Sequence, residues 1–160
     1  MDTPAHTDSQ GLDEHAVARL FDQAPDGIIF ADVEGTIRAW NAAAERIFGF
    51  APGDAIGQNL DIIIPEAFRE RHWAGFERAL AEKRTKYEGQ ALPTRATTAS
   101  GDTIYVELSF AIVLDEEGEA LGALAHARDI TERFERDRAQ RRRVAELERR
   151  IQELGGEVPG

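Results

Sequence analysis

The stretch PDGIIFADVEGTIRAWNAAAERIFGF, residues 25–50, decides the fold. Residues 27–32 (GIIFAD) form a compact apolar run of β-forming residues, and Glu34-Gly35 has the composition of a tight turn. Residues 36–40 (TIRAW) alternate and are predicted to return as a second strand. Asn41 is a favourable residue to cap the start of a helix. The stretch therefore predicts a strand, a turn, a second strand and a helix in immediate succession.

Three more β segments are predicted further along the chain, at 90–98, 103–114 and 120–128. Pro93 weakens the first and favours a sheet edge or a bulge there. The second alternates strongly, which puts its apolar residues on one face. If the last strand pairs with that face, its inward positions are small and leave room for a flat molecule beside the sheet; these positions are Leu121, Ala123, Ala125 and Ala127.

Two further helices are predicted before these strands, one amphipathic at 12–22 and a longer one at 64–80, IPEAFRERHWAGFERAL. In the longer helix four side chains recur every four residues and share one face: Phe68, His72, Phe76 and Leu80. The whole order predicts an α+β domain. Its five-stranded antiparallel sheet carries helices on one side.

The C-terminal part is predicted to be a coiled-coil helix at 130–154, with an apolar seam of Val144, Leu147, Ile151 and Leu154. Pairing with a second copy, giving a homodimer, is favoured over folding back, although both stay open. The predicted domain spans residues 12–129. It lies between a disordered tail at 1–11 and a short tail at 155–160.

Composition excludes several classes of function. The net charge of -11 argues against a nucleic-acid binder. The absence of cysteine excludes disulfides, thiolate ligands and cysteinyl cofactor adducts. No apolar run reaches the roughly 18 residues that cross a membrane, so we expect no membrane partner and a cytoplasmic location. Without a nucleophile triad, phosphate loop or kinase motif, we expect no enzyme activity.

Three segments together resemble a PAS domain: residues 25–50, SGDTIYVELSF at 100–110 and RDITER at 128–133. Within that family, IIIPEAFRERHWAGF at 62–76 is similar to the haem-binding PAS domains of rhizobial oxygen-sensor histidine kinases. In those relatives the histidine of the matching stretch is the proximal iron ligand. The resemblance therefore implies haem b held by His72.

The same resemblance assigns further contacts to haem. Leu92 stands where the oxygen-sensing relatives have an arginine that hydrogen-bonds bound oxygen, so it supplies no such donor. Arg78 matches an arginine that contacts a propionate, and Lys86 matches a histidine near a propionate. The resemblance also implies apolar contacts over the distal side, from Val106, Leu108 and Phe110.

The residues alone leave other interpretations open. A histidine on an apolar helix face is costly to bury without a partner, and iron is one such partner. A backbone carbonyl or a water molecule could also satisfy His72. His126 is the competing ligand, but its strand phase puts it on the outer sheet face, beneath the N-terminal helix. Trp40 is expected to pack in the core and Trp73 to lie at the surface.

The sequence thus favours a haem-based sensor that binds O2, CO or NO, or senses a redox change. It would signal through a dimeric C-terminal helix to a downstream partner or to an output domain outside these 160 residues. The alternative is a PAS dimerisation module whose cavity is empty or holds flavin or another small ligand. Peroxidase-like haem chemistry has little support because no distal acid–base residue can be named.

Overall fold

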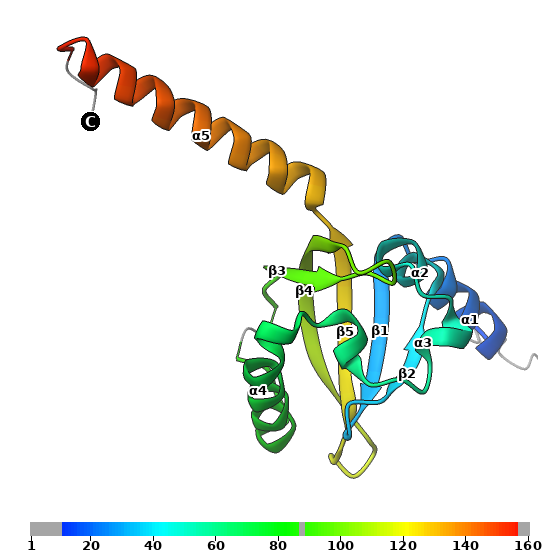
Figure 1. The fold of residues 1–160 in the computed structure, drawn as a ribbon. Coiled ribbons are helices and arrows are strands. Elements are labelled where there is room, and N and C mark those ends of the chain that lie inside the picture. Colours follow the sequence, from blue (N-terminus) through cyan, green and yellow to red (C-terminus); the bar gives the residue numbers. More distant parts are fainter. Residues whose placement is uncertain (1–10, 87–88, 157–160) are drawn as a thin grey trace, which may run out of the picture.

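The computed structural model describes residues 11–86 and 89–156, and the predicted tails at 1–11 and 155–160 lie mostly outside these ranges. Five strands form one antiparallel sheet in the order β2-β1-β5-β4-β3 (Figure 1). The strands are β1 (Gly27–Asp32), β2 (Ile37–Trp40), β3 (Leu92–Thr97), β4 (Thr103–Leu114) and β5 (Ala120–Asp129). This confirms the predicted sheet, and β3 lies at its edge as Pro93 indicated.

The predicted helices are present, but the long one begins differently, and the short helix at Pro52–Ala55 was expected to be a turn. They are α1 (Glu14–Asp22), α2 (Ala42–Phe48), α3 (Pro52–Ala55), α4 (Arg69–Glu82) and α5 (Thr131–Glu153). The helix predicted at 64–80 begins instead as a separate 3-10 turn, η2 (Glu66–Phe68), and becomes α-helical only at Arg69. Another 3-10 turn, η1 (Leu60–Ile63), precedes it.

The core lies on one face of the sheet, where α2, α3 and α4 contact β1, β2 and β5. This core arises because successive side chains of a strand point to opposite faces of the sheet, so that every second residue of β1 is buried. Its largest fully buried apolar side chains are Phe48, Ile37 and Val106. Trp40 is also buried, as predicted, and its indole N–H donates to the carbonyl of Phe50 at 2.9 Å.

Asn41 is completely buried, and its side chain makes four hydrogen bonds. Its Oδ1 accepts from the backbone N–H of Ile28 at 2.8 Å and of Ala44 at 3.0 Å, which caps α2. Its Nδ2 donates to the carbonyls of Phe21 at 2.9 Å and Asp26 at 3.1 Å. One amide therefore joins the end of α1, the start of β1 and the start of α2.

The alanines of β5 face inward as predicted, since Ala127, Ala125 and Ala123 lie opposite Leu108, Phe110 and Ile112 of β4. The prediction that Leu121 also faces inward is wrong. The register shifts beyond Val113, so Leu121 falls in a bulge and is 48% exposed.

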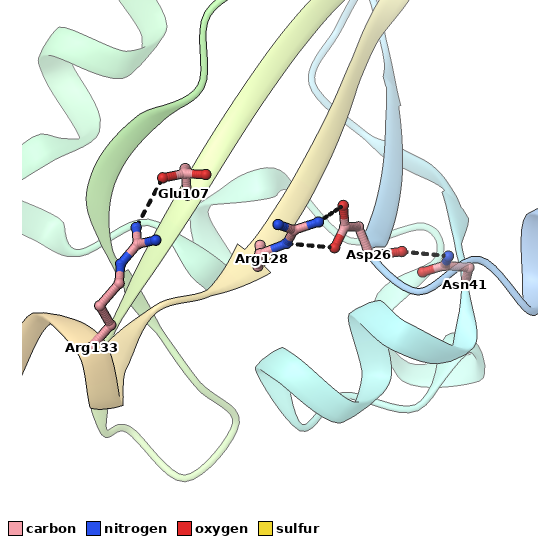
Figure 2. A network of polar contacts seen from close by, with 5 residues as sticks. All are labelled: Asp26, Asn41, Glu107, Arg128 and Arg133. Carbon is pink, nitrogen blue, oxygen red and sulfur yellow. Dashed lines mark hydrogen bonds and ion pairs between the residues drawn. The ribbon is translucent and has the colours of Figure 1, made fainter.

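The exit helix α5 leaves the domain as a single extended arm (Figure 1). One ion pair holds its start to β4, and a second holds the end of β5, from which the helix leaves (Figure 2). Arg133 pairs with Glu107 of β4 at 3.1 Å, and Arg128 of β5 makes two bonds of 3.0 and 3.1 Å to Asp26. The Asp26 carboxylate raises the pKa of the Arg128 guanidinium. The arm therefore begins at a fixed point of the sheet.

Candidate functional site

The buried face of α4 carries the candidate ligand. His72, Trp73, Phe76 and Leu80 are all at least partly buried, whereas the residues between them are mostly exposed. The helix therefore turns His72 and Phe76 toward the domain, as their spacing predicted. Phe76 belongs to the core, and Leu80 packs against it.

The imidazole of His72 lies between two aromatic rings. It meets the indole of Trp73 edge-on at a centroid distance of 4.8 Å, and the ring of Phe76 is 6.0 Å away. Its Nδ1 is buried without a hydrogen-bond partner among the described residues. Burial lowers the pKa of His72, although the Asp61 carboxylate opposes this. The ring is therefore neutral at pH 7, with one ring nitrogen buried and unpaired.

Trp73 positions this part of α4, so the prediction that it lies at the surface is wrong. Its Nε1 donates to Oδ1 of Asp61 at 2.8 Å, which ties the helix to η1. Its ring lies against Gly35, where an added Cβ would come within 2.2 Å of the indole. Arg69 strengthens the same connection by donating to the carbonyl of Ile64 at 3.1 Å.

The inner sheet face near α4 is apolar and incompletely covered. Leu108, Ala123 and Ala125 are half-buried and pack against the same core as Trp73 and Leu80. Phe110 and Ile112 continue this face and are also half-buried, but they are not among the described side chains that pack on the core. Apolar surface therefore remains beside small alanine side chains.

The other residues assigned to haem by resemblance are dispersed. Arg78 is on α4 but exposed, away from the buried face that holds His72, and Lys86 is exposed beyond the helix end. Leu92 is half-buried on β3, directly opposite Leu108. Val106 is fully buried in the packed core.

The competing histidine lies on the other side of the sheet. His126 pairs with Ser109 of β4 and Ile28 of β1 on the outer face, as its strand phase predicted. It is exposed, so α1 does not cover it. No cluster of three or more His, Cys, Asp or Glu side chains that could hold a metal occurs in the described ranges.

These observations fit His72 to haem better than any other described histidine. A neutral imidazole with an unpaired, buried ring nitrogen is a suitable axial ligand. The half-buried leucine, phenylalanine and alanines of the sheet provide an apolar surface for a flat ring. The charged residues assigned to the propionates show no comparable arrangement.

The fold belongs to a known class of protein. The sequence model of the PAS fold matches residues 21–137, so the chain is a member of the PAS family, whose members are sensory and signal-transduction domains. It is 48% identical over 48 residues to the sensor protein FixL of Bradyrhizobium diazoefficiens, covering 30% of this chain. It is 33% identical over 143 residues to an uncharacterized protein of Azorhizobium caulinodans, covering 86% of this chain. The chain spans only 10% and 19% of the lengths of these two relatives.

Solved structures confirm the fold. An RNA-binding light-oxygen-voltage receptor superposes with a TM-score of 0.69 at 22% identity, over 90% of this chain and 41% of that one. A light-oxygen-voltage domain studied with a flavin analogue superposes with a TM-score of 0.57 at 16% identity. The match covers 82% of this chain and 97% of that one. No helix in the described part of the chain is long and apolar enough to cross a membrane.

Sequence reasoning missed the junction between β4 and α5. The backbone carbonyl of Tyr105 accepts from the N–H of Ile130 at 2.9 Å. The backbone N–H of Tyr105 donates to the Thr131 hydroxyl at 3.0 Å. The Tyr105 ring stacks on Phe134. These contacts join residues far apart in the chain, so no periodic pattern announces them.

Proposed function

We propose that this PAS domain binds haem b through His72 and acts as a gas or redox sensor. The observation that carries the proposal is the buried, unpaired Nδ1 of a neutral His72 beside an incompletely covered apolar sheet face. The similarity to a sensor protein FixL supports it, together with the resemblance of residues 62–76 to haem-binding PAS domains.

Bound haem would supply an iron that binds O2, CO or NO, or that changes its oxidation state. The chain's own residues would bind and orient the ring. His72 would hold the iron, Phe110 and Leu108 would exclude water, and Leu92 would line the edge without donating a hydrogen bond. Arg78 and Lys86 are the proposed propionate contacts.

The output of the sensor is proposed to pass through α5. The junction at Tyr105 couples this helix to β4, the strand that carries Leu108 and Phe110. A second copy of the chain would pair along α5, and a downstream partner or output domain would respond. We propose no catalytic activity; turnover of hydrogen peroxide by the haem-loaded protein would contradict this.

The test is an absorption spectrum of the protein produced with haem supplied. A Soret band is expected in the native protein and in His126→Ala, the exposed histidine control. The band is expected to disappear in His72→Ala while circular dichroism stays unchanged. A band of equal strength in His72→Ala would exclude the proposed ligand.

A second candidate function is a PAS module that binds flavin without a covalent adduct or another small ligand, or that has an empty cavity. The structural similarity to light-oxygen-voltage domains favours the flavin version. Because the chain contains no cysteine, such binding would be non-covalent. A flavin spectrum after purification would support this candidate, and a colourless protein would leave the empty or small-ligand version.

A further inference from the structure

The distal half of α5 presents an apolar stripe that nothing in the described chain covers. Its residues Val144, Leu147 and Ile151 are 48%, 48% and 38% exposed, and Leu154 directly follows the helix end at 87%. An exposed stripe at this spacing is typical of a helix that pairs with another helix.

The stripe has the register of a coiled coil. Val144 and Ile151 occupy a positions, and Leu147 and Leu154 occupy d positions. Extended upstream, the same register places Arg133, Asp137 and Gln140 at the a and d positions, and these residues are polar and exposed. The apolar contact is therefore confined to the distal end of the arm, over about 15 Å at 1.5 Å per residue.

The charges beside the stripe distinguish between the possible orientations. In a parallel pair, a g residue of one helix faces the e residue five positions later on its partner. Arg143 is such a g residue and Glu148 the matching e residue, so a parallel pair gains two Arg–Glu contacts by symmetry. In an antiparallel pair that keeps the same apolar layers, Glu148 would face Glu148 and Arg150 would face Arg150.

The ion pairs within the arm agree with this assignment. Arg150 pairs with Glu146 at 3.7 Å, and Arg136 pairs with Glu132 at 3.1 Å. In the described part of the chain, neither Arg143 nor Glu148 has an ion-pair partner. A parallel partner would bring these two opposite charges together.

We propose that α5 pairs with α5 of a second copy in a parallel, in-register coiled coil, joined by Arg143 of each chain to Glu148 of the other. The inference deepens the proposed output through α5 and is independent of haem. Near the domain Asp137 would face Asp137 and Arg136 would face Arg141, so the arms would separate there and meet only beyond Gln140.

Cysteine cross-linking tests the orientation, because the native chain has no cysteine. In the parallel pair two copies of Val144→Cys lie opposite each other and form a disulfide under mild oxidation. In the antiparallel pair they are about 15 Å apart, beyond the roughly 7 Å that a disulfide spans. There, Val144→Cys would instead cross-link with Leu154→Cys. A homodisulfide of Val144→Cys is expected; cross-linking only in the mixed sample, or a monomer in sedimentation with neither product, overturns the proposal.

Charge reversal tests the proposed pairs. Arg143→Glu and Glu148→Arg are each expected to weaken dimerisation roughly tenfold, and the double swap to restore it. Arg142→Glu, with the same charge change outside the seam, is the matched control. Equal effects of Arg142→Glu and Arg143→Glu would contradict the pairing. Haem absorbance is expected to be unchanged in these variants, so failure here is distinguishable from failure of the haem proposal.

Discussion

The ring of Tyr105 on β4 lies against the ring of Phe134 on α5, with centroids 3.8 Å apart and planes 16° from parallel. Val106, the next residue of β4, points the other way and is fully buried in the core. The Arg95 guanidinium lies 5.9 Å from the Tyr105 ring centroid. One short segment of β4 therefore contacts both the core and the exit helix.

Removing this stack should loosen the start of α5. We expect Phe134→Ala to lower the free energy of unfolding by about 1–2 kcal/mol, because a stacked aromatic contact and apolar burial are both lost. Denaturant unfolding measures the loss, and hydrogen exchange should accelerate in the first two turns of α5. Glu135→Ala, an exposed neighbour, is the control; equal effects of both variants would contradict a role for the stack.

Gly35 should tolerate no side chain because of Trp73. Gly35→Ala would place a Cβ 2.2 Å from the indole at a φ of +83°. We expect a loss of about 1–3 kcal/mol and a shift in tryptophan emission. Gly118→Ala is a matched control, since its φ is +80° but no atom lies within 4 Å of the added Cβ. A similar cost in both variants would show that backbone strain alone explains the effect.

Asn41 should be among the costliest polar residues to replace. Asn41→Ala leaves two N–H groups and two carbonyls, all at least partly buried, without their partner, and we expect a loss of about 2–4 kcal/mol. Asn59 makes one exposed capping bond at 2.8 Å, so Asn59→Ala should cost about 1 kcal/mol or less. Thermal unfolding compares the two, and an equally mild effect at Asn41 would refute the importance of its network.

His72 should make the stability of the haem-free protein depend on pH. Its pKa is lowered from the usual 6.5 in the folded state, so below pH 6.5 the unfolded chain binds more protons. Above pH 6.5 the histidine is neutral in both the folded and the unfolded chain and does not reduce the free energy of unfolding. That free energy should fall as the pH drops below 6.5. Unfolding measured from pH 7.5 to 5 should show this slope weakened in His72→Phe and retained in His126→Phe. If haem binds His72, haem affinity should fall over the same range.

Leu92 should determine how the proposed haem site treats oxygen. Bound oxygen carries partial negative charge and is stabilised by a hydrogen-bond donor. We therefore expect Leu92→Arg to slow oxygen release from the haem-loaded protein, whereas Leu92→Met should leave the rate nearly unchanged. Stopped-flow measurement of oxygen dissociation compares them; an unchanged or faster rate in Leu92→Arg would argue against this position.

Where a local pattern is strong, the sequence predicted the structure closely. The bounds of β4 are those that its alternation indicated, and Asn41 caps α2 as expected. These features depend on neighbours a few residues apart, so the chain itself contains the information. The buried face of α4 was also predicted, since His72 and Phe76 lie one helical turn apart.

The errors concern contacts that local patterns do not specify. Trp73 was expected at the surface because a strict four-residue row omits it, yet the helix buries a wider stripe and Asp61 accepts its N–H. Leu121 was placed inward because strict alternation cannot reveal that this residue lies in a bulge. The stack of Tyr105 on Phe134 joins two segments 29 residues apart and has no local signal.

The central position of β5 has a consequence for how the chain is made. Because β1 and β4 meet only through β5, the two halves of the sheet have no common edge until this last strand emerges. A nascent chain still lacking residues 120–129 would expose the edges of β1 and β4 to wrong pairing. The sheet can therefore close only after residues 120–129 have emerged, immediately before the arm itself is extruded from the ribosome.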